Sequence, residues 1–534
     1  MAGYNTKQFL IVDDFADFRS ALISMLRQLG ARDIDAVSNG EDALALCRKK
    51  HYDIILHDYN LGRGKNGQQV LEALHHERLL KPDCVFVLIS ADSSQAMVMA
   101  ALECEPDSYL AKPFNLVSLQ RRLDQLVAMK TALLPILEAQ HEGNYTVMLS
   151  CCKQILASHP RYRSQCQRYM VIALAGLQQH QAQEQLLHKV IREQPTAWAL
   201  QALADLYRET GRLSEAQQTY EEGIRQFPMM PALYDGLAAT ALALGDPLEA
   251  QQQLQQGLSV SPNSLRRQQS MGDLARRNKD HEQAVRAYRQ AVELGRNSVF
   301  RNPENNLNLV SSLQAEAGDS TPSQRMLGEV RQVLTELDRS YKDDPALLVR
   351  SRLAQAQTLH MAGQTQDAKR LAAQAAEHVA EAAGLFSIEA ALRVAEQLRE
   401  LEQSEQADTV LGTCAEMYGD DPDVMEQLAS MTDNPAILLA GSDALEWNQQ
   451  GILAYQQREY PQALTLFRQA LAAQPRNISF ALNTAQSLLR LMAGQADASL
   501  LDECRYCLHQ ASHMQPNDHR RERYLKLCNR LEKM

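Results

Sequence analysis

Four short apolar runs, each leading into polar residues, constrain the fold of the N-terminal part of the chain more than any other feature. The run at residues 54–56 does not alternate between apolar and polar positions, which is typical of a parallel strand covered on both faces. The carboxyl ends of parallel strands meet at one edge of a sheet, where functional residues of open α/β folds gather. The runs are Phe9–Val12, Ile54–Leu56, Val85–Ile89 and Tyr109–Ala111, and the polar residues after them are Asp13 and Asp14, Asp58, Ser90 and Lys112.

A further short strand at Asp33–Val37, with helical segments between the runs, predicts a doubly wound, parallel five-stranded α/β domain. Each polar residue alone has a simpler interpretation. An aspartate or serine after a strand usually caps the next helix, and a single lysine is usually solvated. Because all of them occur in one α/β segment at successive strand ends, a functional pocket is the better interpretation.

With this set of motifs, the segment 8–130 resembles the receiver domain of bacterial response regulators. The resemblance implies that Asp58 is a nucleophile, which accepts a phosphoryl group from a histidine of a sensor histidine kinase or phosphotransfer protein. It also implies a bound Mg2+, a hard cation that prefers oxygen ligands. The implied ligands are Asp13, Asp14, Asp58 and the backbone carbonyl of Asn60.

The same resemblance assigns a switch. Lys112 and Ser90 would contact the phosphoryl oxygens, and Tyr109 would move inward after Ser90. The Lys112–Pro113 peptide bond would be cis, as in the family. The loop after Asp58 departs from the family pattern, because Gly62 stands where a proline is usual and residues 61–67 are one residue longer. Its Gly-Arg-Gly-Lys run lacks the spacing of a P-loop and is interpreted as a flexible basic loop.

Beyond about Leu137 strand signals disappear, and a helical pattern with a fixed period takes over. Ala216, Ala250 and Ala284 follow each other at steps of 34 residues (250 − 216 and 284 − 250). Gly211 and Gly245 repeat this step five residues earlier. Small residues where helices cross, with a glycine turn between them, resemble tetratricopeptide repeats. An all-α helical-repeat solenoid is therefore predicted after the α/β domain.

The repeat pattern is clear in some segments and degenerate in others. It is strong over residues 197–296, returns at Trp447–Pro475, and decays between Asn297 and Asn434, where Asn297–Asn306 and Gly318–Pro322 are predicted connectors. The predicted domains are a receiver (8–130), tetratricopeptide repeats (131–296), degenerate helical repeats (297–436) and C-terminal repeats (437–534).

The first helix of each repeat presents a polar stripe opposite its buried face, which predicts a groove for an extended or helical peptide. The alternative is that Trp198 packs against the preceding repeat and the charges are only solvated. The stripe residues are Trp198, Gln201, Asp205 and Arg208 in one repeat and Arg266, Gln269, Asp273 and Arg276 in another.

Composition limits the remaining functions. A net charge of −11 and the lack of a helix-turn-helix signal disfavour a nucleic-acid partner. No signal-peptide core and no apolar run of about 18 residues occur, so a cytoplasmic protein without membrane insertion is expected. Cys504 and Cys507 have metal or redox spacing, but their helical context favours reduced, buried thiols.

The preferred interpretation is a response regulator that is not an enzyme and whose output is protein–protein interaction. A kinase phosphorylates Asp58, and access of a partner to the repeats changes; self-association as a homodimer is a further route. Two alternatives stay open. One is an enzyme with an unrecognised catalytic centre in residues 297–534, and the other is a constitutive repeat scaffold with an independent phosphoacceptor.

Overall fold

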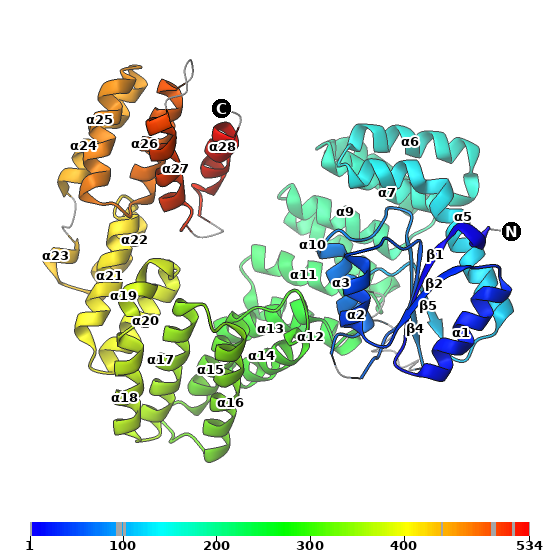
Figure 1. Cartoon of the computed structure of the whole chain (residues 1–534), viewed down its shortest axis with the longest axis horizontal. Coiled ribbons are helices and arrows are strands. Elements are labelled where there is room, and N and C mark those ends of the chain that lie inside the picture. The colour runs from blue at the N-terminus through cyan, green and yellow to red at the C-terminus, as the bar shows by residue number, and fades with distance from the viewer. Residues whose placement is uncertain are drawn as a thin grey trace. The chain divides into compact units, whose positions relative to one another are not determined.

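The computed structural model describes residues 3–62, 64–91, 99, 103–438, 442–492, 498–514 and 518–532. Its N-terminal domain contains a parallel five-stranded sheet with strand order β2-β1-β3-β4-β5 (Figure 1). The order reverses direction between β1 and β3, as the predicted doubly wound fold requires. The strands are β1 (Gln8–Val12), β2 (Asp33–Val37), β3 (Ile54–Asp58), β4 (Val85–Ser90) and β5 (Ser108–Ala111).

Helices cover both faces of this sheet, which explains the uninterrupted apolar runs. Leu22 of α1 and Leu119 of α5 pack on one face, while Leu44 of α2 and Val70 of α3 pack on the other. Every residue of β3 and β4 is buried as a result. The bounds are η1 (Tyr4–Thr6), α1 (Ala16–Gln28), α2 (Gly40–Cys47), α3 (Gly67–His76) and α5 (Leu116–His141).

Helix α5 belongs to two hydrophobic cores. Its first half packs Leu119 and Leu123 against the sheet. Its second half packs Leu133 and Ile136 against the following helices α6 and α7. The helix is uninterrupted from Leu116 to His141.

Antiparallel helix pairs follow α5 up to Gly295. Ala216, Ala250 and Ala284 are each fully buried at the crossing of a pair, which confirms the 34-residue period. Gly211 and Gly245 take left-handed φ values of 78° and 85° in the turn between the helices, where glycine has no Cβ penalty. The helices are α6 (Tyr145–Ser158), η2 (Pro160–Tyr162), α7 (Arg163–Gly176), α8 (His180–Glu193), α9 (Ala197–Glu209), α10 (Leu213–Gln226), α11 (Pro231–Ala243), α12 (Pro247–Val260), α13 (Leu265–Arg277) and α14 (His281–Gly295).

The chain divides into two compact units, Met1–Asn305 and Asn306–Met534. The predicted connector at Gly318–Pro322 is confirmed, since α15 ends at Ala317 before α16 begins at Gln324. The connector predicted at Asn297–Asn306 is confirmed only up to residue 303, because α14 ends at Gly295 and α15 begins at Glu304. The helices from this point are α15 (Glu304–Ala317), α16 (Gln324–Ser340), α17 (Pro345–Met361), α18 (Thr365–Ala376), α19 (Val379–Ala382), η3 (Ala383–Leu385), α20 (Ile388–Glu400), α21 (Ser404–Tyr418), α22 (Pro422–Met431), α23 (Pro435–Leu438), α24 (Ser442–Gln456), α25 (Tyr460–Ala473), α26 (Ile478–Leu491), α27 (Ala498–Ala511) and α28 (Arg521–Leu531).

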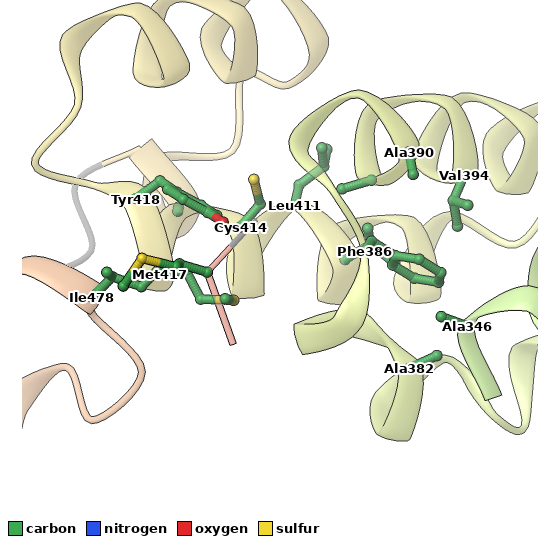
Figure 2. Packing of buried hydrophobic residues seen from close by; sticks show 14 of the residues in the cluster. Ala346, Ala382, Phe386, Ala390, Val394, Leu411, Cys414, Met417, Tyr418 and Ile478 are labelled. Atoms are coloured by element: carbon green, nitrogen blue, oxygen red, sulfur yellow. The ribbon is translucent and has the colours of Figure 1, made fainter. Parts of the chain in front are cut away.

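One hydrophobic core runs through most of the second unit. Figure 2 shows Phe386 packed near Ala346 and Val394, and Met417 lying toward Ile478 of α26. The predicted boundary at 436 therefore falls within a stretch whose flanking helices share one core. Where the repeat pattern decays, the short helix α19 and the 3-10 turn η3 replace a full hairpin helix.

The structure bears on two further sequence features, the Cys504–Cys507 pair and the question of a membrane span. Cys504 and Cys507 are buried free thiols, and burial raises the pKa of Cys504 to about 11 and that of Cys507 to about 12. Such thiols are chemically inert. Among the described residues, no helix combines the length and apolar character needed to cross a membrane.

Candidate functional site

The carboxyl ends of β1, β3 and β5 bring three of the predicted residues into contact. Asp13 directly follows β1, Asp58 is the last residue of β3, and Lys112 directly follows β5. The Lys112 Nζ lies 2.7 Å from Asp13 Oδ2 and 2.6 Å from Asp58 Oδ2. Asp14 completes a carboxylate cluster in which one oxygen of each aspartate lies within 4.8 Å of the others.

Backbone hydrogen bonds hold these side chains at the sheet edge. The Asp13 Oδ1 accepts the backbone N–H of Phe15 at 2.9 Å, and the Asp13 carbonyl accepts the Arg19 guanidinium at 2.6 Å. The Asp58 Oδ1 accepts the backbone N–H of Asn60 at 3.2 Å. Both oxygens of Asp58 therefore have a donor, Asn60 on one side and Lys112 on the other.

Burial and the contacts between carboxylates and the ammonium have opposite effects on the pKa values in this site. Burial raises the pKa of Asp58, and the adjacent Lys112 ammonium opposes this effect. Burial alone would lower the pKa of Lys112, but Asp13 and Asp58 more than offset it and raise that pKa. Three carboxylates facing one ammonium leave an excess of negative charge. Such an oxygen-only donor set fits Mg2+, which is bound by carboxylates and water.

Comparisons with known proteins agree with this geometry. The model of the response regulator receiver domain matches residues 9–124. Models of the tetratricopeptide repeat match residues 201–264, 448–511 and 265–297. The N-terminal part is a response regulator receiver domain, and tetratricopeptide repeats follow it. No strand is found in the described part of the repeats, as their helical fold requires.

Three similar proteins match a stretch of the chain about as long as the receiver domain. Chemotaxis protein CheY-3 of Vibrio cholerae is 29% identical over 119 residues, which are 22% of this chain and 90% of the relative. CheY of Pseudomonas aeruginosa is 26% identical over 119 residues, covering 22% of this chain and 94% of its own. The structure of the receiver domain of sensor histidine kinase PA1611 from Pseudomonas aeruginosa, with magnesium in its active site cleft, is 27% identical. It covers 23% of this chain and 98% of its own, with a TM-score of 0.21.

The two residues predicted to act as a switch, Ser90 and Tyr109, lie on β4 and β5. Ser90 is buried at the end of β4, and its carbonyl accepts the backbone N–H of Lys112 at 2.8 Å. Tyr109 is half-buried and packs against the hydrophobic cluster under α2 and α3. The Lys112–Pro113 peptide bond is cis, as the sequence predicted.

Two residues of the site escaped sequence reasoning. The Phe18 ring lies beneath the Lys112 ammonium, with Nζ 4.0 Å from the ring centroid, and Phe114 packs edge-on against it. This cation–π contact favours one position of the lysine. The signal in the sequence was weak, because Phe18 lies in the first turns of α1, where an aromatic residue ordinarily indicates core packing.

His57 was also given no role from the sequence. Its Nδ1 lies 2.6 Å from the Asp58 carbonyl oxygen, and its ring stacks on Phe86. Complete burial lowers the pKa of His57 to about 4, so the imidazole is neutral at pH 7. A neutral imidazole that donates Nδ1–H to this carbonyl helps to fix the backbone orientation of Asp58.

The predicted groove residues differ in exposure and in their hydrogen-bond partners. Asp205 accepts the Tyr220 hydroxyl at 2.6 Å, and Asp273 accepts the Tyr288 hydroxyl at 2.5 Å, so both aspartates join the helices of their own repeat. Trp198 is half-buried and packs against a hydrophobic cluster formed by residues of α7–α11. The others are Gln201, Arg208, Gln269 and Arg276, which are half-buried, and Arg266, which is exposed.

A hollow in the repeats adjoins part of this stripe. A cavity of about 530 Å³ lies between α11 and α13, and Arg266 and Asp273 are among its lining residues. The helix pair α11–α12 is the middle one of the three clear repeats, α9–α10, α11–α12 and α13–α14. Where the preceding repeat has Tyr220 and Asp205, this middle repeat has Leu254 and Ala239, which also line the cavity. The smaller side chains of the middle repeat thus coincide with this hollow.

Proposed function

We propose that this protein is a phosphoacceptor of a two-component system, in which phosphorylation of Asp58 changes protein–protein interaction by the helical repeats. One observation carries the proposal: the Asp58 carboxylate lies at the sheet edge, 2.6 Å from the Lys112 ammonium and beside Asp13 and Asp14. A nucleophile, a countercharge and an acidic cluster in one pocket are the parts that phosphoryl transfer to aspartate needs.

In the proposed reaction an Asp58 carboxylate oxygen attacks the phosphorus of a phosphohistidine on a partner kinase or phosphotransfer protein. The new P–O bond forms as the P–N bond breaks, and the electron pair stays on the departing imidazole nitrogen, which takes a proton from solvent. Asp13, Asp14 and Asp58, with the Asn60 carbonyl, would hold Mg2+, which when bound neutralises the charge of the transferring group. Lys112 pairs with the phosphoryl oxygens.

The switch proposed for the receiver uses Ser90 and Tyr109. Ser90 stands at the end of β4, next to β3 and Asp58, from where its hydroxyl can donate to a phosphoryl oxygen. Tyr109 on β5 is only half-buried, so its ring has room to move when Ser90 is drawn inward. The output is a change in the contacts of the repeats, which is a binding function rather than catalysis.

The test is phosphorylation of the full chain by a small phosphodonor with Mg2+, measured as incorporated label. Asp58→Asn keeps the shape of the side chain but removes the nucleophilic carboxylate, so we expect label to fall to background. Asp17→Asn, an exposed aspartate in the first turn of α1, is the matched control and should label normally. Equal labelling of the Asp58→Asn protein would refute the assignment of the phosphoacceptor.

A further inference from the structure

The loop before α3 and one side of that helix form a second contact surface of the receiver domain. This surface contacts the end of the third clear repeat, α13–α14. The Lys65 ammonium donates to the Asn297 carbonyl, and the Asn297 side-chain amide donates to the Gly64 carbonyl at 2.9 Å. Further along, the Gln69 amide donates to the Leu294 carbonyl at 3.2 Å. We call Gly64, Lys65, Gln69, Glu72 and His76 the docking edge, and residues 294–300 the connector.

Apolar contacts accompany these hydrogen bonds. Val299 of the connector packs against the hydrophobic cluster of the receiver under α2 and α3. The Phe300 ring lies edge-on to His76, with centroids 6.1 Å apart, and the Arg266 guanidinium of α13 lies 5.0 Å from the same ring. Phe300 thus contacts the receiver on one side and a repeat on the other, so the connector is positioned by both.

A second group of contacts holds the receiver against the same repeats. Arg267 is 4% exposed and pairs with Asp235 of its neighbouring repeat at 2.6 Å and with Glu103 of the receiver at 2.9 Å. Arg168 of α7 pairs with Glu105 at 2.6 Å. Because a buried ion pair is costly unless its partners are well placed, the Arg267 contact favours one receiver position. The docking edge is therefore part of an extended contact.

Asp58 is connected to the docking edge through a short loop. The Asn60 backbone N–H donates to Asp58 Oδ1, and the Asn60 side chain accepts the Gly62 backbone N–H at 3.1 Å. Three residues further on is Lys65, whose side chain reaches the connector. Both Asp58 oxygens already accept a donor, so attaching a phosphoryl group to either oxygen changes the hydrogen bond from Asn60 or the one from Lys112. The loop thus carries a bond that phosphorylation can alter.

We propose that the docking edge is an output surface of this receiver, and that phosphorylation of Asp58 releases the connector from it. The proposal rests on the phosphoacceptor function proposed above. It gives a role to the loop that departs from the family pattern, since Gly64 and Lys65 of its Gly-Arg-Gly-Lys run make the connector contacts. Release frees the segment that joins the third repeat to the helices beyond it.

Charge determines the direction of the change. A phosphoryl group adds about −1.5 to −2 charges beside the loop. An anion is a stronger acceptor for the Lys65 ammonium than the neutral Asn297 carbonyl. Phosphorylation therefore favours positions of Lys65 that do not bridge to the connector, and the polar half of the docking contact is weakened.

Hydrogen exchange of the full chain, with and without beryllofluoride and Mg2+, tests the proposal. We expect amides in residues 64–76 and 290–301 to exchange about tenfold faster in the presence of beryllofluoride. Val299→Asp places a charge against the receiver cluster and should give the same increase without beryllofluoride. Leu248→Asp, at a 63% exposed leucine of α12, is the matched control and should leave both segments protected.

The outcomes separate the two proposals. Lys65→Met, which removes the donor but keeps the length of the side chain, should raise exchange at 290–301 while α13 stays protected; this checks that the repeats remain folded. If beryllofluoride alters exchange around Asp58, Ser90 and Tyr109 but not at 290–301, the docking edge is not an output surface and the phosphoacceptor function stands. If beryllofluoride alters neither region and no label enters Asp58, both proposals fail.

Discussion

Lys112 is the residue of the receiver site with the most charge contacts. Its ammonium contacts two carboxylates and the face of Phe18 at once. Each contact favours the charged form in a site that is largely shielded from water, where charge interactions are stronger than in solvent. In the resting site the lysine compensates Asp58. Once the phosphoryl group is present, the same lysine can pair with its oxygens without moving to a new pocket.

Replacing this lysine is therefore expected to uncouple phosphorylation from the switch. Lys112→Met keeps the length of the side chain but removes the charge. We expect phosphodonor labelling of Asp58 to slow about tenfold, and beryllofluoride-dependent exchange changes at Ser90 and Tyr109 to disappear. Lys130→Met, which removes a similarly shielded lysine paired with Asp107 at 2.8 Å, is the control. Identical switching in the Lys112→Met and wild-type proteins would contradict the role of Lys112.

At the scale of elements, the sequence predicted the strands of the receiver well, because parallel strands covered by helices have a distinctive apolar pattern. It also placed Asp13, Asp58 and Lys112 correctly at the carboxyl ends of β1, β3 and β5. It did not predict the partners of Asp205. Periodicity assigns a residue to a face of its helix, but the long Tyr220 side chain carries a hydroxyl from the buried face to the polar stripe.

The bond between Tyr220 and Asp205 recurs 68 residues later (288 − 220), two periods along, between Tyr288 and Asp273. Because Tyr220 is fully buried and its hydroxyl binds a carboxylate, Tyr220→Phe is expected to destabilise the α9–α10 pair by about 1–2 kcal/mol. The check is native-state hydrogen exchange of α9 and α10. Tyr506→Phe, at a 52% exposed tyrosine of α27, should have no effect there. Unchanged protection in Tyr220→Phe would show that the bond adds no stability.

At the scale of the whole molecule, the receiver and the clear repeats form one compact unit, Met1–Asn305, and the predicted domain boundary at 130 falls inside α5. The reason is α5, whose apolar residues serve the receiver before this point and the repeats after it. The connector contacts escaped prediction for a different reason. They join residues 225 to 233 positions apart through side chains and backbone carbonyls, and no periodic pattern marks such pairs.

The second half of α5 is expected to stabilise the repeats. Leu133 and Ile136 are 2% and 0% exposed, and each contributes about 1.5–3 kcal/mol of burial. A fragment of residues 131–305 should therefore unfold at a higher temperature than one of residues 142–305, by several degrees. Both should have helix-dominated circular dichroism spectra, and thermal unfolding followed by that signal is the measurement. Equal midpoints would mean that the second half of α5 does not stabilise the repeats.

Because one continuous helix joins the receiver to the first repeat, the two parts are locked in angular phase as well as in distance. Each residue of an α-helix adds about 100° of rotation and 1.5 Å of rise. One residue inserted into the middle of α5 would turn the receiver away from Val299 and Arg267, whereas seven residues, about two turns, would nearly restore its orientation at a greater distance. Exchange of receivers between proteins of this design, in evolution or in the laboratory, is thus constrained by helical phase at this junction.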